Sequence, residues 1–227
     1  MAKILQLKIR VEEIKPPIWR RFLVKEDITF EKLHEIIQEL MDWDNYHLYE
    51  FNVNNISIAL DEDEGFNPAE GILNQLKNSP EFTKLLEQQD LSKGGVTLDV
   101  KKVNKILQEA NKKKITKEKS GVNIIISKII NQEKLKFSYY YDFGDNWENI
   151  IVVEKILEEE PNKKYPVCID GARAGPPEDC GGVWGYEELM EIQKDKNHPD
   201  YEERIVEWLG EDFDFEEFDM NKINEKL

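Results

Sequence analysis

Two strand-like segments separated by a short acidic turn constrain the fold of this chain most strongly. Residues 134–141 are rich in aromatic side chains and residues 147–156 in β-branched ones, and both kinds are common in β-strands. The intervening residues 142–146 contain Asp, Gly and Asn, which are typical turn formers. We therefore expect a β-hairpin, with Gly144 in the left-handed backbone conformation that a tight turn needs.

The predicted turn brings carboxylates together at one end of the hairpin. Asp142, Asp145 and Glu148 lie in or next to it, where loops often carry function. Such a group could bind a cation or act as a general acid and base. The structural alternative is that the two aspartates accept hydrogen bonds from turn amides while Tyr141 and Trp147 pack in the core.

The charge of the chain limits its partners. The sequence has 47 acidic and 31 basic residues, which gives a net charge of -16 and a field that repels phosphate backbones. Nucleic-acid binding is therefore disfavoured, except through the lysines from Lys101 to Lys119, which more simply form a solvated helix face. No apolar run is long enough to cross a bilayer and the N-terminus lacks a signal peptide, so we expect a cytoplasmic protein without membrane contact.

The N-terminal region predicts two paired strands and a helix. Residues 4–11 and 18–24 alternate apolar and polar side chains, as half-buried strands do. Apolar residues then recur at helical spacing over residues 30–40, with Thr29 or Asp27 available as the cap. A second pair of strands is expected on either side of the Asn54-Asn55 turn.

Four polar side chains in this region have structural explanations. Arg20 and Arg21 are expected to form internal ion pairs, because the chain is rich in carboxylates. His34 lies between apolar positions of the predicted helix, so it is expected to be packed or at the edge of solvent. His47 precedes a strand and is either a structural hydrogen-bonding group or a metal ligand, since imidazole commonly binds transition metals.

Residues 61–133 are predicted to be a helical, lysine-rich insertion in a single domain of residues 1–227. Two capping residues precede prolines in this segment, and Asp99 can cap a third helix. Residues 122–130 are uniformly apolar, and we favour a helix there.

Residues 165–186 contain five glycines and three prolines, so we expect an ordered loop without regular structure. Glu178 and Asp179 supply carboxylates to this loop, and Cys168 and Cys180 supply thiols. The cysteine spacing does not match a zinc knuckle, so a metal site would need a histidine from elsewhere. The alternative is that the acidic side chains bond loop amides and both cysteines are buried, reduced thiols.

The C-terminal region predicts two further helices, over residues 187–194 and 201–209. The tail after them has three phenylalanines that could dock onto the domain, and its last residues, from about Asn221, should fray.

Five sequence blocks follow one another along the chain: Pro-Pro-Ile-Trp-Arg-Arg, Leu-His-Glu-Ile-Ile-Gln, Trp-Asp-Asn-Tyr-His-Leu-Tyr-Glu-Phe, Tyr-Asp-Phe-Gly-Asp-Asn-Trp-Glu and Gly-Pro-Pro-Glu-Asp-Cys-Gly-Gly-Val-Trp-Gly-Tyr. In this order they resemble the plasmid pRi ORF-3-like family, some members of which accompany insertion elements under a resolvase label. The resemblance covers roughly residues 1–60 and 134–220. It implies an α+β domain with a mixed or largely antiparallel sheet, helices packed on that sheet and no established biochemical activity.

The chain departs from the family pattern at two positions. It has Asn149 where the family commonly has histidine, and Gly175 where the family often has cysteine. Both missing groups are good ligands for transition metals, which lowers the expectation of such a centre. The acidic residues match the family pattern, so a site built from them would favour a hard cation or a cationic side chain.

Two functions follow from these patterns. The first is a binding module without enzymatic activity, whose ligand is a protein or a small molecule. The second is a hydrolase or nuclease in which the carboxylates hold a divalent metal and His47 is the base. No cofactor is established; a transition metal would involve His47, Cys168 and Cys180. The candidate binding residues are His47, Tyr141, Asp142, Asp145, Trp147, Glu148, Pro176, Pro177, Glu178, Asp179 and Trp184.

Overall fold

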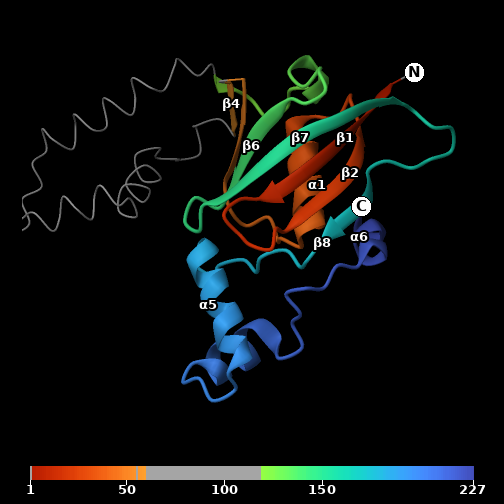
Figure 1. Cartoon of the computed structure of the whole chain (residues 1–227). Coiled ribbons are helices and arrows are strands. Elements are labelled where there is room, and N and C mark those ends of the chain that lie inside the picture. The colour runs from red at the N-terminus through yellow and green to blue at the C-terminus, as the bar shows by residue number, and fades with distance from the viewer. Residues whose placement is uncertain (1, 55, 60–118) are drawn as a thin grey trace, which may run out of the picture. The chain divides into compact units, whose positions relative to one another are not determined.

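The computed structural model describes residues 2–54, 56–59 and 119–227, and an eight-stranded sheet is the centre of this part (Figure 1). The strand order is β5-β4-β3-β6-β7-β1-β2-β8, and all neighbours are antiparallel except β4 and β5. Helices accompany the sheet, which confirms the predicted α+β class. Residues 60–118 lie outside the described residues, and so do the helices predicted there and the lysines from Lys101 to Lys117.

The predicted pairing of the two N-terminal strands is confirmed. β1 (Lys3–Val11) and β2 (Trp19–Lys25) run antiparallel, with Leu7 opposite Phe22. Both of these side chains are fully buried, as the alternating pattern predicts. β7 (Trp147–Glu158) pairs with the other side of β1, which therefore lies inside the sheet.

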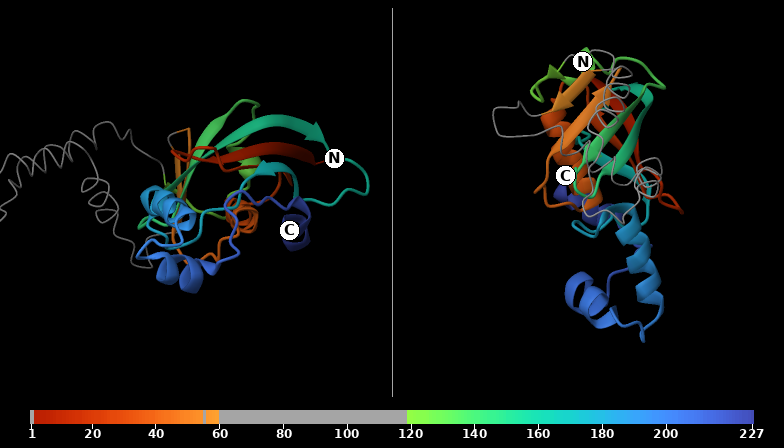
Figure 2. Two further views of the ribbon diagram at one scale, coloured as in Figure 1. Left: turned by 60° about the horizontal axis from the view of Figure 1, so that its bottom comes forward. Right: turned by 90° about the vertical axis from the view of Figure 1, so that its left-hand side faces the viewer.

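Helix α1 (Phe30–Met41) lies on one face of the sheet (Figures 1 and 2). Thr29 caps the helix by accepting a hydrogen bond from the backbone N–H of Lys32 at 3.1 Å, as predicted. The apolar stripe of the helix, which includes Leu33, is buried. The helix ends at Asp42, whose backbone is left-handed.

The predicted central hairpin is confirmed, but its turn differs from the expectation. β6 (Lys136–Tyr141) pairs with β7, and the left-handed residues between them are Asp142 and Asn146, at φ 53° and 55°. Gly144 is not left-handed, so the expectation for it is wrong. Asp and Asn tolerate this conformation because their side chains bond locally, and Oδ1 of Asp142 accepts the N–H of Gly144 at 2.8 Å.

The second predicted hairpin is also present. β3 (Tyr49–Val53) pairs with β4 (Ile56–Ala59), and the backbone of Asn54 between them is left-handed. β3 lies beside β6, while the short β5 (Lys119–Ser120) pairs with β4 at the edge of the sheet.

Residues 122–130 do not form the helix that we favoured. They contain one 3₁₀ turn, η2 (Ile126–Lys128), and their backbone bonds to the segment that leads into α1. The N–H of Ile126 donates to the carbonyl of Ile28 at 2.8 Å, for example. These long-range bonds replace the local ones of a helix.

Residues 165–186 carry more regular structure than predicted. β8 (Val167–Ala172) pairs with β2, and α5 (Gly182–Lys194) begins before the expected position, so the irregular parts are residues 165–166 and 173–181. The strand is a tertiary effect, because β2 supplies its hydrogen-bond partners and a glycine-rich sequence does not reveal them.

The C-terminus is ordered, so the predicted fraying is wrong. The π-helix η3 (Glu202–Gly210) precedes α6 (Met220–Lys226), whose N-cap is Asp219. The Asn224 side chain accepts the N–H of Cys168 at 2.7 Å and donates to its carbonyl at 2.9 Å. These bonds fix α6 beside β8, which is the other edge of the sheet (Figure 1).

Candidate metal-binding site

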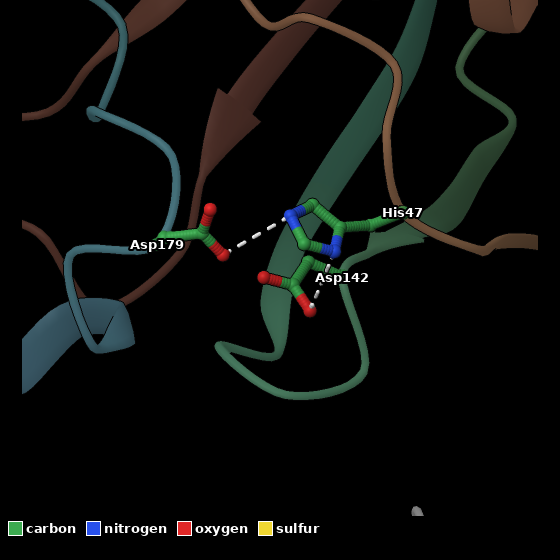
Figure 3. A group of neighbouring side chains, drawn as sticks. All are labelled: His47, Asp142 and Asp179. Carbon is green, nitrogen blue, oxygen red and sulfur yellow. Dashed lines mark ion pairs between the residues drawn. The ribbon is translucent and has the colours of Figure 1, made fainter.

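Three segments that are distant in the sequence meet at the turn of the β6–β7 hairpin (Figure 3). His47 comes from the connection between α1 and β3, Asp142 from the turn, and Asp179 from the loop that precedes α5. The convergence of His47 with the two acidic stretches, which the sequence left open, is therefore a property of the fold. One ligand atom from each of the three residues lies within 4.8 Å of the others.

The imidazole of His47 lies between the two carboxylates. Its Nδ1 is 3.7 Å from Oδ1 of Asp142, and its Nε2 is 3.2 Å from Oδ1 of Asp179. The second distance suits an ion pair, yet the geometry does not make a hydrogen bond, and Nε2 is shielded from solvent without such a partner among the described residues. Asp142 is nearly buried, whereas the Asp179 side chain is 70% exposed. One carboxylate is thus fixed and the other is open to solvent.

The backbone determines where His47 and Asp142 lie. The N–H of Asp142 donates to the carbonyl of Leu48 at 3.0 Å, which continues the β3–β6 pairing by one step and places His47 beside the turn. The ring of His47 also lies edge-on to Tyr141, with centroids 5.8 Å apart. The ring orientation therefore depends on packing as well as on charge.

The loop that carries Asp179 is anchored through aromatic side chains. The hydroxyl of Tyr141 donates to Glu178, and burial raises the pKa of this hydroxyl above its ordinary value. The indole N–H of Trp43 donates to the carbonyl of Pro176 at 2.8 Å, and the Trp43 ring stacks on Tyr141 at 4.7 Å. These contacts explain why the Pro-Pro-Glu-Asp block is ordered without regular structure.

Asp145 and Glu148 take structural roles. A carboxylate oxygen of Asp145 accepts the N–H of Gly181 at 3.0 Å, and burial raises the pKa of that carboxyl. A Cβ at Gly182 would lie 2.4 Å from the Asp145 carbonyl oxygen, so the turn and the start of α5 approach as only glycine permits. Glu148 accepts the hydroxyl of Tyr140 at 3.0 Å.

The remaining candidate residues lie apart from the His47 group. Trp147 is fully buried and its indole N–H has no partner among the described residues, whereas Trp184 is 83% exposed. Cys168 and Cys180 are buried free thiols, and neither belongs to the ligand group that His47 forms in the described part of the chain. Burial raises the pKa of Cys180 to about 12, so this thiol is neutral at physiological pH.

Gly175 and Asn149, where the chain departs from the family pattern, both lie outside the His47 group. A Cβ at Gly175 would lie 1.8 Å from the carbonyl oxygen of Met41, so this backbone has no room for a side chain. Asn149 is buried on β7, where its amide donates to the carbonyl of Trp147 at 3.2 Å. The departures at these positions therefore leave His47, Asp142 and Asp179 intact.

Sequence reasoning did not assign Trp43 its role in anchoring the loop, and it overestimated Trp147 as a binding residue. The motif Trp-Asp-Asn-Tyr-His contained the signal, because a tryptophan four residues before His47 falls on the same connection. Its hydrogen bond to Pro176 spans the fold and is not visible in any local pattern.

The fold and the aromatic-anchored acidic loop define an α+β protein with a candidate ligand group, and comparison with other proteins gives its family. Residues 3–222 match the family described as plasmid pRiA4b ORF-3-like protein, and the chain belongs to that family. It is 26% identical over 228 residues to the uncharacterized protein y4hQ of Sinorhizobium fredii (strain NBRC 101917 / NGR234), covering 100% of this chain and 92% of the relative.

A solved structure is similar over nearly the whole chain. The crystal structure of the protein of unknown function MM3350 from Methanosarcina mazei Go1 matches with a TM-score of 0.68 and 32% sequence identity, covering 98% of this chain and 97% of the other. Among the helices of the described residues, none has the length and apolar composition that crossing a membrane requires.

Proposed function

We propose that this protein is a binding module whose centre is a divalent metal ion held by His47, Asp142 and Asp179. The observation that carries the proposal is the state of His47 Nε2, which is shielded from solvent, lacks an aligned hydrogen-bond partner among the described residues and lies 3.2 Å from a carboxylate oxygen. A buried ring nitrogen without a partner is costly. An ion bound there would accept the lone pair of the nitrogen and offset the negative charge of the two carboxylates.

The donor set favours zinc or manganese. Imidazole suits borderline transition ions, and carboxylate oxygens bind both of these ions as well as harder ones. Asp142 lies at Nδ1 of His47 and Asp179 at Nε2, and one ligand atom from each of the three residues lies within 4.8 Å of the others, so one ion between them could bind all three side chains.

The hydrogen bonds of the carboxylates around the site favour a binding function over a hydrolytic one. A hydrolase would need a free acid or base near the ion. Asp145 is occupied by the N–H of Gly181, Glu178 by the hydroxyl of Tyr141 and Glu148 by that of Tyr140. Their bonds hold the loop and the strands in place, so they support a site that binds rather than one that transfers protons.

Exposed apolar side chains near the site offer a surface for a protein or small ligand. Tyr46 and Leu48 flank His47 in the sequence and are exposed, Tyr46 by 79%. Trp184 lies in the first turn of α5, which follows the loop that carries Asp179. Large exposed aromatic side chains are common at binding surfaces, and a metal ion could organise this one.

Titration calorimetry with zinc and manganese chlorides tests the proposal. The intact chain should bind about one ion, and His47→Gln, Asp142→Asn and Asp179→Asn should each weaken binding roughly tenfold or more. Asp142→Asn keeps the oxygen that accepts the Gly144 N–H, so the turn should survive.

His198→Gln is the matched control, because His198 is a partly exposed histidine 3.8 Å from the Asp200 carboxylate. It should bind the ion as the unaltered chain does. Equal loss of affinity in the control, or unchanged affinity in all three site variants, would contradict the assignment.

A further inference from the structure

The Pro-Pro-Glu-Asp loop also borders a cavity that none of the His47-group residues lines. This cavity of about 220 Å³ opens between the C-terminal end of α1, residues 174–177 and the tail of residues 213–226. Its apolar lining includes Leu40, Phe213 and Phe218, and Arg20 lies in its wall. The volume is below that of pockets for drug-sized molecules, so a ligand would be small.

The guanidinium of Arg20 uses only part of its hydrogen-bonding capacity. Its Nε donates to the carbonyl of Leu40 at 2.8 Å, and its Nη1 donates to the carbonyls of Trp19 and Ala172, both at 3.0 Å. A guanidinium has five N–H groups, so these bonds account for three of them. Nη2 has no hydrogen-bond partner among the described residues, and Arg20 lines the cavity.

Arg20 has no ion-pair partner in the described part of the chain, although its guanidinium carbon lies 5.0 Å from the centroid of the Phe218 ring. The chain has five arginines, and the other four each form an ion pair with a carboxylate. The pairs are Arg10 with Glu12, Arg21 with Glu154 and Asp170, Arg173 with Glu216, and Arg204 with Glu188. Arg20 is 3% exposed, has no such partner in the described part of the chain, and so does not form the ion pair that its sequence context led us to expect. Burial lowers the pKa of Arg20 to about 10, and the nearby Cys168 and Asp42 partly oppose this shift.

A structural role alone accounts for only part of this geometry. The three carbonyl bonds connect α1, β2 and β8, and they explain why an arginine lies at this position. They do not use Nη2 of Arg20, a buried side chain that lines the cavity. Arginine is the preferred partner of carboxylates, which accept hydrogen bonds from it with charge assistance.

The rim of the cavity carries carboxylates, whose charge is opposite to that of Arg20. Lys226 pairs with Asp42, and Lys222 pairs with Glu217 at 3.3 Å, which compensates two of the rim carboxylates. Glu39 also lines the cavity, and it has no ion pair with another described residue. A cationic group on a ligand would complement that carboxylate.

From these observations we propose that the cavity binds a small zwitterion such as an α-amino acid with an apolar side chain. Its carboxylate accepts hydrogen bonds from Nη2 of Arg20, its ammonium group lies toward Glu39, and its side chain contacts the apolar lining. The site is separate from the His47 group and does not depend on a bound metal ion.

Titration calorimetry of the full chain with a matched set of small molecules tests this proposal. The twenty amino acids are tested first. Leucine is then compared with 4-methylpentanoate, which lacks the ammonium group, and with isopentylamine, which lacks the carboxylate. We expect binding of an apolar amino acid, at least tenfold weaker binding of the carboxylate alone and no measurable binding of the amine. Absence of binding by all amino acids, or equal binding of the amine, would overturn the proposal.

Variants identify the site independently of the ligand series. Arg20→Met removes the guanidinium but also three carbonyl bonds, so it could unfold the chain. Ala174→Leu fills the cavity and leaves those bonds intact, and it should abolish binding. Glu39→Gln should weaken binding of the amino acid about tenfold, whereas Glu35→Gln, one turn earlier on α1 and outside the cavity lining, should not. Unchanged affinity in Ala174→Leu would place any bound ligand elsewhere and refute the assignment.

Discussion

His34 is buried in a neutral form that its neighbours require. Its Nε2 lies 2.6 Å from Oδ1 of Asn45, its Nδ1 lies 2.7 Å from the hydroxyl of Tyr139, and its ring stacks on Tyr49 at 3.5 Å. Gln38 also donates to the Tyr139 oxygen at 2.9 Å, so that hydroxyl directs its own proton to Nδ1. Nδ1 of neutral His34 accepts the hydrogen bond from this hydroxyl, whereas Nδ1 of protonated His34 could not.

This burial predicts a pH-dependent stability. Desolvation lowers the pKa of His34 from 6.5 to about 4 in the folded chain, so between these values the unfolded state binds a proton that the folded state does not. The free energy of unfolding should therefore fall as pH decreases from about 6.5 to 4, by about 3 kcal/mol in total. Urea unfolding at a series of pH values measures this change.

The variant His34→Gln separates this residue from the many carboxylates that also titrate in acid. It should be less stable than the unaltered chain at pH 7, and its stability should depend less on pH in that window. An identical pH profile in the two proteins would show that His34 does not carry the effect.

The hydroxyl of Tyr141 is predicted to position the metal-binding loop. Tyr141→Phe removes its bond to Glu178, the residue before Asp179, and keeps the ring against His47 and Trp43. The affinity for zinc should fall several-fold, in line with a contribution of about 1 kcal/mol from one hydrogen bond. Tyr140→Phe is the control, because its hydroxyl bonds Glu148 on the neighbouring strand. If both variants bind zinc alike, the hydroxyl of Tyr141 has no positioning role.

At the level of elements, α6 protects an open edge of the sheet. β8 is an edge strand, and the Asn224 side chain satisfies both backbone groups of Cys168 on it. Unprotected strand edges promote association of chains. Asn224→Ala should lower the free energy of unfolding by about 1–3 kcal/mol and increase self-association, measured by urea unfolding and light scattering. Asn221→Ala on the same helix is the control; an equal effect there would assign the loss to helix propensity.

Local patterns predicted the elements whose hydrogen bonds are local or whose faces are half buried. The pairing of β1 with β2, the capped helix α1 and the β6–β7 hairpin all followed from periodicity and turn residues. β8 and the segment of residues 122–130 did not, because their backbone partners lie on β2 and before α1. Tertiary pairing overrides local propensity at such positions.

The candidate site was predictable in composition but not in geometry. The turn carboxylates, His47 and the Pro-Pro-Glu-Asp loop could be named from the sequence as separate candidates. Their convergence depends on the bond from the Asp142 N–H to the Leu48 carbonyl and on the anchoring of Pro176 by Trp43. Which carboxylates remain open to a ligand depends on the same long-range contacts, so spacing alone could not separate Asp179 from Asp145.

For the whole molecule, the described domain is predicted to fold without the segment between β4 and β5. The chain divides into one unit of residues 1–60 and 119–227 and another of residues 61–118. β4 and β5 pair in parallel, with Ser57 beside Lys119, so a linker of about twelve glycine and serine residues, the length that a parallel connection needs, should replace residues 61–118. The shortened chain should unfold cooperatively and bind zinc with unchanged affinity. Loss of either property would show that the segment is required for the domain.

The most direct test of the metal-binding account is a histidine-selective nitrogen NMR spectrum recorded during a zinc titration. The chain has three histidines, so each imidazole can be followed separately. The account predicts that an equimolar amount of zinc shifts the ring nitrogens of His47 while those of His34 and His198 stay in place. If His47 does not respond at that ratio, or if His198 responds first, the account is contradicted.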